Sequence, residues 1–345
     1  MITTAKTVTF GEIMLRLSPP GFERFFQSPV LQATFGGGEA NVAVSLAHFG
    51  CESYYVSRVP ANAIGDGAVR ALRAEGVRTD YVQRGGARLG IYFAETGASQ
   101  RPSTVVYDRA GAAVSAIKPG DIAWDEVLAG ARWFHVTGIT PALGPGVADA
   151  TREALDAARR AGARISMDLN YRAKLWGTDR AREVMRPLAS MTDVIIANEE
   201  DIQACLGIEV HGADVTAGQL DASAYRDAAA RVVREFGVKQ VAITLRESYS
   251  ASRNGWSAVL YDGPGSEFWQ GPRYDVTLVD RIGGGDSFAA GLIFGLATGR
   301  APESALRFAI AASALKQTVP GDFNRVSAAE VDRLALGDQS GRVLR

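Results

Sequence analysis

Short apolar runs alternate along most of the chain with longer stretches rich in Ala, Arg and Glu. The apolar, often β-branched runs predict strands at residues 8–17, 53–59, 133–137, 164–169, 194–197 and 240–245. The stretches between and after them predict helices at residues 39–49, 67–75, 147–161, 222–236, 286–296 and 302–318. Strand–helix alternation of this kind predicts an α/β fold with a mostly parallel central sheet covered by helices on both faces.

Two stretches interrupt this alternation. Residues 22–35 are aromatic and polar without a helical period, and residues 88–115 have the pattern of strands and turns, with strands at 89–95 and 104–107. Both stretches are too long to be simple connections in an α/β core. We therefore predict a single α/β domain over residues 1–345, with a small β-sheet lid formed by residues of about 13–35 and 88–115.

Composition narrows the class of protein further. The 345 residues suffice for one large domain, and 37 Lys and Arg balance 38 Asp and Glu without a basic run. This balance argues against nucleic acid or an anionic membrane as a partner, and no apolar run approaches the roughly 18 residues of a membrane span. Cys51 and Cys205 are expected to be buried free thiols. Residues 1–6 lack the apolar region of a signal peptide, so we expect a cytoplasmic protein.

A glycine run before an apolar helix is the strongest chemical signal. Gly283, Gly284 and Gly285 have no Cβ, so their backbone can turn sharply and direct several N–H groups to one point. A helix that begins there adds its positive dipole end, and together these features bind an anion. Asp286 beside a bound phosphate is well placed to accept a proton, which predicts phosphoryl transfer. From the sequence, Asp286 could equally be an N-cap that follows a glycine turn.

Three other clusters offer binding groups. Residues 36–38 form a second glycine run, and Asn41 follows one turn into the next helix; the alternative is a flexible hinge. Residues 168–172 end a strand, where open α/β sheets bind ligands, and Arg172 there offers a cation or only a surface salt bridge. Residues 198–201 end another strand; their oxygen atoms suit Mg²⁺, or they form an acidic first helical turn.

Several common nucleotide and hydrolase motifs are missing from the sequence. There is no Gly-x-x-x-x-Gly-Lys-Ser/Thr, so a P-loop enzyme is excluded. No Gly-x-Gly-x-x-Gly follows the first predicted strand, and no Gly-x-Ser-x-Gly occurs. A nicotinamide dehydrogenase and a serine hydrolase are therefore unsupported.

The clusters, in this order and approximate spacing, resemble the ribokinase-like (PfkB) carbohydrate kinases. The resemblance runs from Gly11 to about Val331. It implies a ribokinase-like three-layer sandwich with a mostly parallel central sheet and a small β-sheet lid. Residues 11–12, 244–248 and 318–324 are most similar to family members that act on 2-keto-3-deoxygluconate. The resemblance thus implies ATP- and Mg²⁺-dependent phosphorylation of this sugar acid to its 6-phosphate.

The resemblance also assigns a role to each matching residue. Asp286 would be the catalytic base, and the amides of Gly283, Gly284 and Gly285 would stabilise the transferring phosphoryl group. The sugar-acid site would comprise Gly37, Gly38, Asn41, Tyr92, Tyr107, Arg109, Arg172 and Asp286. The nucleotide site would comprise Asn198, Thr244, Arg246, Gly283, Gly285 and Lys316, with Asp201 contacting the metal through water. Two arginines and two tyrosines suit a carboxylate-bearing substrate.

Some positions depart from the family pattern. Glu12 stands where relatives usually have an Asp that bonds to sugar hydroxyls, and Gly284 replaces the usual Ala but keeps every backbone donor. Asp201 is one methylene shorter than the family's Glu, and Arg246 and Glu247 replace part of the usual nucleotide segment. These changes fall at the positions that the resemblance assigns to the metal and the nucleotide.

The alternatives are a fructokinase or other PfkB sugar kinase and a non-catalytic sugar-acid-binding protein. We expect Arg109 to discriminate between them, because a neutral sugar would leave its charge unpaired. The expected partners are a small sugar acid and ATP, with no nucleic acid and no membrane. Ile91, Phe93, Val105 and Val106 are too apolar for an exposed lid, which predicts a homodimer joined lid to lid, or a higher homo-oligomer.

Overall fold

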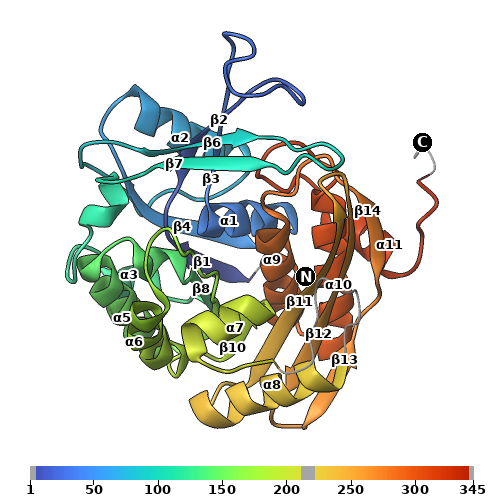
Figure 1. The fold of residues 1–345 in the computed structure, drawn as a ribbon. Helices are drawn as coiled ribbons and strands as arrows, with labels where there is room; N and C mark the ends of the chain where they lie inside the picture. Colours follow the sequence, from blue (N-terminus) through green and yellow to red (C-terminus); the bar gives the residue numbers. More distant parts are fainter. Residues whose placement is uncertain (1–4, 211–221, 342–345) are drawn as a thin grey trace.

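The central sheet of the computed structural model is mostly parallel (Figure 1). The structure describes residues 5–210 and 222–341, and within these ranges the sheet has ten strands in the order β13-β12-β11-β10-β9-β8-β1-β4-β5, with β14 beside β12. The parallel strands are β1 (Lys6–Phe10), β4 (Glu52–Val59), β5 (Val82–Arg84), β8 (Trp133–Thr137), β9 (Arg164–Asp168), β10 (Val194–Ala197) and β11 (Gln240–Ser250). The antiparallel strands are β12 (Arg253–Asp262), β13 (Glu267–Gln270) and β14 (Tyr274–Thr277). The α/β fold class expected from the sequence is confirmed.

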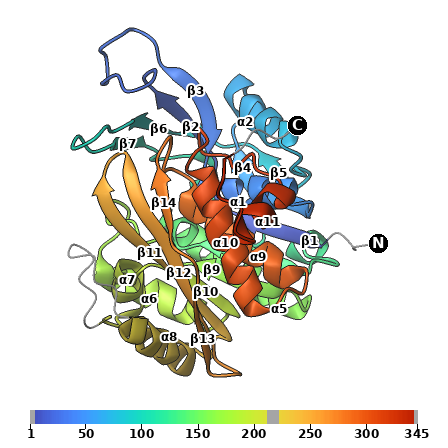
Figure 2. The ribbon, with the colours of Figure 1, turned by 90° about the vertical axis from the view of Figure 1, so that its right-hand side faces the viewer.

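Helices cover both faces of this sheet (Figures 1 and 2). One face packs against α3 (Trp124–Val127), α5 (Pro145–Arg160), α6 (Thr178–Ala189), α7 (Glu199–Leu206) and α8 (Ala222–Phe236). The other packs against α1 (Gly38–His48), α9 (Gly284–Ala297), α10 (Pro302–Lys316) and α11 (Ala328–Ala335). Strand β10 shows why two cores form: Ile195 enters the first, while Val194 and Ile196 enter the second. The expected three-layer sandwich is therefore present.

A second, smaller sheet lies beyond one end of the central strands (Figure 2). Its four strands, all in the described part of the chain, have the order β3-β2-β6-β7. They are β2 (Met14–Ser18), β3 (Gln32–Gly36), β6 (Gly90–Glu95) and β7 (Thr104–Asp108). Parts of both stretches that interrupt the strand–helix alternation thus contribute strands to a separate small sheet, as predicted, and we call this sheet the lid.

The predicted single strand at 8–17 is wrong. The chain leaves the central sheet after Phe10 and enters the lid at Met14, so β1 and β2 belong to different sheets. A Cβ at Gly11 would collide with the carboxylate of Glu39, which explains a glycine at this change of direction. Because Phe10, Ile13 and Met14 are all buried, the apolar pattern continues across the break and conceals it.

Several boundaries also differ from the prediction. Helix α2 (Ala63–Ala74) begins four residues before Gly67, because the Asn62 side chain accepts hydrogen bonds from the N–H groups of Ile64 and Gly65. Strand β11 extends to Ser250 because β12 pairs with it as a long hairpin. The chain between β7 and β8 contains the short helix η1 (Ala113–Ala116), and the short helix α4 (Ile139–Ala142) lies between β8 and α5. Among the residues described, no helix combines the length and apolar character that a membrane crossing requires.

Candidate active site

A cavity of about 520 Å³ opens between the lid and the ends of the parallel strands. Asp168 and Ala197 line it from the carboxyl ends of β9 and β10, and Tyr92 and Val105 line it from the lid. This edge of an open α/β sheet is where such folds bind ligands. The sequence-predicted residues that line it are Gly37, Gly38, Asn41, Tyr92, Tyr107, Arg109, Arg172, Asn198, Asp201, Thr244, Arg246, Gly283, Gly284, Gly285 and Asp286.

The N-terminus of α9 forms the anion-binding end of this cavity. Gly283 is the N-cap, with a left-handed φ of 84°, and a Cβ there would collide with the carbonyl oxygen of Asp322. The N–H groups of Gly285 and Asp286 lie in the first helical turn, where a helix offers them no carbonyl partner. A Cβ on Gly285 would meet no atom within 4 Å, so space for a ligand lies in front of these amides. The arrangement fits a phosphate group, and we call it the anion hole.

Asp286 lies at the entrance of the anion hole and is held by α1. The Asn41 side chain donates a hydrogen bond of 2.7 Å to Oδ2 of Asp286 and accepts one of 3.2 Å from the N–H of Gly37. Burial raises the pKa of Asp286 to about 7, against the lowering effect of the Asn41 bond. No side chain caps α9, so the structure does not support the N-cap interpretation of Asp286. A carboxylate with this pKa is suited to general base catalysis near neutral pH.

Two more carboxylates line the floor of the cavity. Burial, followed by the charges of Asp201 and Asp286, raises the pKa of Asp168 well above its usual value. Burial also raises the pKa of Asp201 to about 6. Asp201 belongs to a capping box with Asn198 at the start of α7, and its Oδ1 accepts a 2.9 Å bond from the N–H of Tyr171. Residues 198–201 therefore also form the acidic first helical turn that was the alternative interpretation of this cluster.

These acids do not form a ready-made metal site. Within residues 5–210 and 222–341, no group of three acidic, His or Cys side chains has the geometry to hold a metal ion. Mg²⁺ usually keeps several waters and binds through one or two carboxylates plus substrate phosphates. Asp201 and its neighbours thus fit a hydrated Mg²⁺ that arrives with a nucleotide.

Arginines line the cavity at both ends. Arg172 is exposed, and its Nη1 donates a 2.9 Å bond to the carbonyl of Tyr171. Arg281, which we did not select from the sequence, lies directly before the anion hole; burial and then the nearby charge of Arg246 lower its pKa. The positive charges of these two guanidinium groups repel each other, and a polyanion bound between them would relieve the repulsion. The sequence could have indicated Arg281, because this residue lies next to the glycine run at 283–285.

The lid arginine, Arg109, already has a buried partner. It forms an ion pair with Glu12, whose side chain is 2% exposed, and its guanidinium lies 5.2 Å from the ring centre of Tyr107. Glu12 itself does not line the cavity. The expectation that a neutral sugar would leave the charge of Arg109 unpaired is therefore wrong, because Glu12 neutralises it.

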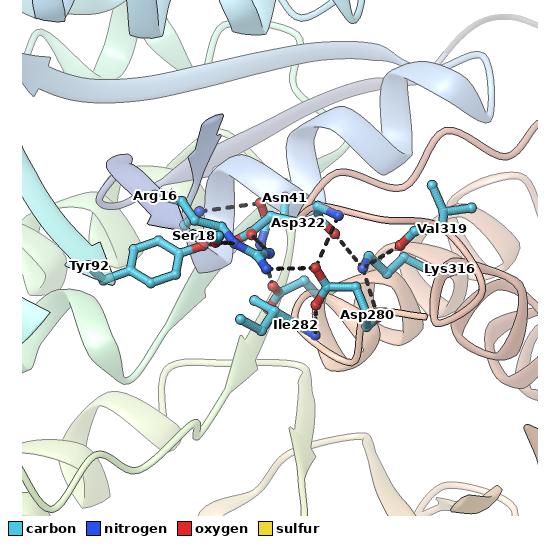
Figure 3. Close-up of polar contacts among 12 residues, drawn as sticks. Arg16, Ser18, Asn41, Tyr92, Asp280, Ile282, Lys316, Val319 and Asp322 are labelled. Carbon is cyan, nitrogen blue, oxygen red and sulfur yellow. Dashed lines mark hydrogen bonds and ion pairs between the residues drawn. The ribbon is translucent and has the colours of Figure 1, made fainter. Parts of the chain in front are cut away.

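A buried polar network supports the cavity wall (Figure 3). The Tyr92 hydroxyl donates a 2.5 Å bond to Asp322, and Arg16 on lid strand β2 pairs with Asp280 and Asp322 at 2.7 Å each. Asp322 also lines the cavity, although no local sequence pattern indicates it. Its partners come from positions more than 200 residues away in the sequence, so local patterns could not reveal them.

Lys316 is the one predicted site residue outside the cavity lining. It is fully buried, and its ammonium donates hydrogen bonds to the carbonyls of Asp280, Val319 and Gly321 at 3.1, 3.4 and 2.6 Å (Figure 3). All of its N–H groups point at main-chain oxygens behind the anion hole. The prediction that Lys316 contacts the nucleotide is corrected on this ground.

Comparison with known proteins agrees with this geometry. The model of the pfkB family carbohydrate kinases matches residues 4–328. The chain is 36% identical over 338 residues to 2-dehydro-3-deoxygalactonokinase of Haloferax volcanii, covering 98% of this chain and 99% of the relative. It is 49% identical to the crystal structure of 2-dehydro-3-deoxygluconokinase from Thermotoga maritima, with a TM-score of 0.93 over 96% of this chain and 100% of the other. The chain belongs to the PfkB family of carbohydrate kinases.

A more distant structure shares the fold. Fructokinase from Xylella fastidiosa, solved with bound ATP, is 22% identical and has a TM-score of 0.75 over 96% of this chain and 98% of the other. At this identity the likeness supports the ribokinase-like fold and not the choice of sugar.

Proposed function

We propose that this kinase transfers the γ-phosphoryl group of ATP to the terminal hydroxyl of 2-keto-3-deoxygluconate and releases ADP and the 6-phosphate. The observation that carries the proposal is Asp286, a carboxylate with a pKa of about 7, beside free amides at the N-terminus of α9. The two similar kinases are named for the gluconate-derived and the galactonate-derived sugar acid, which supports this substrate class.

The residues of the anion hole account for the chemistry. Asp286 accepts the proton of the attacking hydroxyl, and Asn41 keeps its carboxylate in position through the 2.7 Å bond. The amides of Gly283, Gly285 and Asp286 stabilise the charge on the transferring phosphoryl group. The predicted contribution of Gly284 is weaker, because its N–H already donates a 3.3 Å bond to the carbonyl of Arg281. When bound with ATP, Mg²⁺ would offset phosphate charge, and Asp201 would hold it through water.

The nucleotide binds along the carboxyl ends of β10 and β11 in this proposal. Asn198, Thr244 and Arg246 line that part of the cavity, and Arg281 lies between them and the anion hole. The paired charges of Arg246 and Arg281 would neutralise the triphosphate.

The sugar acid binds beneath the lid. Because Glu12 already pairs with Arg109, we assign the main contact with the substrate carboxylate to Arg172. Arg172 has no carboxylate within 4 Å among the described residues, and it lines the cavity close enough to Asp286 to influence its pKa. Tyr92 and Tyr107, whose ring centres lie 6.0 Å apart, form the wall of the sugar site.

One substrate screen tests the assignment. ATP turnover is measured with 2-keto-3-deoxygluconate, its galactonate-derived epimer, fructose, ribose and gluconate. We expect the two keto-deoxy acids to give the highest kcat/KM; the relative from Haloferax volcanii is the reason to include the epimer. A preference for fructose would replace the proposal with a fructokinase, and binding without turnover would favour a sugar-acid-binding protein.

We further propose that the protein is cytoplasmic and forms a homodimer through the outer face of the lid. Tyr92 pairs with Tyr107 and Phe93 with Val106, so these pairs lie on opposite faces of the lid. Val105 faces the cavity, which makes it unsuitable as an interface residue. The outer face exposes 48% of Val106, and an apolar edge strand of this kind tends to pair.

Light scattering tests the dimer. Val106→Glu is expected to convert a dimer into a monomer, whereas Leu336→Glu, at a side chain that is 89% exposed directly after α11, should leave the mass unchanged. A wild-type monomer with full turnover contradicts the dimer and leaves the kinase assignment intact.

A further inference from the structure

Lys316 is a fully buried lysine whose ammonium contacts main-chain oxygens. It ends α10, and its three hydrogen bonds go to the carbonyls of Asp280, Val319 and Gly321, which we call the carbonyl cage. A lysine ammonium has three donors, and burying it is costly unless they are all satisfied. The cage satisfies each of them. The site is therefore a cation site made of neutral oxygens, with the cation attached to the chain.

The carbonyl cage joins two loops that build the anion hole. Asp280 lies three residues before Gly283, and its carboxylate accepts bonds from the N–H groups of Ile282 and Gly321 at 3.1 and 3.0 Å. The side-chain stem of Lys316 passes 3.1 Å from the position of a Cβ on Gly283. The ammonium thus fixes the two loops from behind, opposite to the side that faces the cavity.

Charge balance in this region depends on the same lysine. Asp280 and Asp322 are buried and share Arg16, so Arg16 and Lys316 together balance the two carboxylates (Figure 3). Asp286 lies close enough to Lys316 for their charges to interact. Loss of the ammonium would leave excess negative charge behind the base.

We infer that Lys316 is a positioning residue, whose tethered ammonium occupies the carbonyl cage and sets the geometry of the anion hole without touching ATP or sugar. The inference rests on the phosphoryl-transfer function proposed above. It predicts that a small free cation can replace the ammonium once the side chain is removed, because the cage oxygens remain.

The experiment compares the full-length Lys316→Ala variant with wild type at saturating sugar acid and ATP. We expect kcat to fall about ten- to a hundredfold with KM for ATP within about threefold, because the contacts to the nucleotide remain. Adding ammonium chloride or potassium chloride should raise kcat several-fold in the variant and leave kcat of the wild type unchanged. Choline chloride, whose cation is too large for the carbonyl cage, is the control for ionic strength. Lys239→Ala, at a lysine that is 62% exposed, is the matched variant and should retain wild-type kinetics.

Lys316→Gln covers the case in which Lys316→Ala does not fold, because an amide still donates to two carbonyls without carrying charge. For this variant we expect lower kcat and an acid limb of the kcat/KM profile displaced to higher pH, since a lost cation disfavours the charged form of Asp286. A purely structural role would lower the melting temperature without moving the acid limb. Three results would each overturn the inference. The first is an unchanged kcat, and the second is a rise in KM for ATP alone. The third is a loss of kcat that comes with neither rescue by cations nor a displaced acid limb. Wild-type turnover is the separate test of the proposed function, because the inference concerns only the ratio of variant to wild type.

Discussion

The two ends of the cavity are built from different parts of the chain. The anion-hole end consists of main-chain N–H groups at the start of α9, held by the buried contacts of Asp280 and Lys316. The lid end consists of side chains on a four-stranded sheet within the described ranges, and Tyr107 there is 37% exposed. In the proposed mechanism, main-chain groups supply the charge stabilisation, and side chains supply the contacts that distinguish one sugar from another.

This difference explains which departures from the family pattern matter. Gly284 in place of the usual Ala keeps its main-chain N–H, which donates a 3.3 Å bond to the carbonyl of Arg281, so we expect no change at the anion-hole end. At the lid end, Glu12, which is longer than the usual Asp, forms an ion pair with Arg109 and neutralises its charge. We therefore expect this one substitution to change the electrostatics of the proposed sugar site and to leave the proposed catalytic end as it is.

Removal of the base should give the largest effect. We expect Asp286→Asn to lower kcat by roughly 10²–10⁴ with little change in either KM, because a general base contributes about this much. Steady-state kinetics provides the measurement. Near-normal turnover would mean that Asp286 is not the base.

The same substitution should raise the stability of the folded protein although it lowers the activity. Because the pKa of Asp286 is raised to about 7 in the folded state, its stabilisation is fully present below the unfolded pKa and is lost as the pH rises through 7. Asp286→Asn should therefore melt at a higher temperature than wild type at pH 8, with the difference disappearing near pH 4. A lower melting temperature at pH 8 would contradict the burial argument.

At the lid end, the two arginines should behave differently. Arg172→Ala removes a charge-assisted bond worth about 1.5–3 kcal/mol, so KM for the sugar acid should rise roughly ten- to a hundredfold, with little change for a neutral sugar. Arg109→Ala leaves Glu12 buried without a partner, so both kinds of substrate should be affected.

A double variant separates these effects. Glu12→Gln combined with Arg109→Gln removes both charges of the buried pair, and it should recover part of the activity that Arg109→Ala loses. If Arg109→Ala impairs only charged substrates, Arg109 binds the carboxylate directly and our assignment to Arg172 is wrong.

Two glycines of the anion hole offer a matched pair of smaller perturbations. A Cβ on Gly285 would point into the open cavity, so Gly285→Ala should keep the melting temperature and reduce turnover by about tenfold through a clash with the phosphoryl group. Gly283→Ala should lower the melting temperature, since φ is 84° and the Cβ meets the Asp322 carbonyl. Equal melting temperatures for the two variants would contradict the described loop geometry.

The smallest expected change comes from Asn41. Its hydrogen bond lowers the pKa of Asp286, so Asn41→Leu should displace the acid limb of kcat/KM to higher pH by about one unit. Activity at pH 6 should therefore fall more than activity at pH 8.5. An unchanged limb would show that Asn41 does not act on the protonation of the base.

Local patterns identified most of the elements but failed where burial is continuous. The strands at 133–137 and 194–197 have the bounds of β8 and β10, since each is a short apolar run between polar ends. The prediction at 8–17 failed because residues that face two different sheets are equally apolar. Asp168 and Asp286 were recognisable because strand ends and glycine turns are local features.

The amino-acid sequence by itself determined the α/β alternation, the separate lid and the glycine turn that ends in Asp286. Each of these depends on residues close together in the chain, through side-chain periodicity or the backbone freedom of glycine. Only the tertiary structure decided that Glu12 pairs with Arg109 and that Lys316 lies behind the anion hole rather than beside the nucleotide. A charged side chain takes the nearest partner that folding brings to it, and that partner can lie anywhere in the sequence.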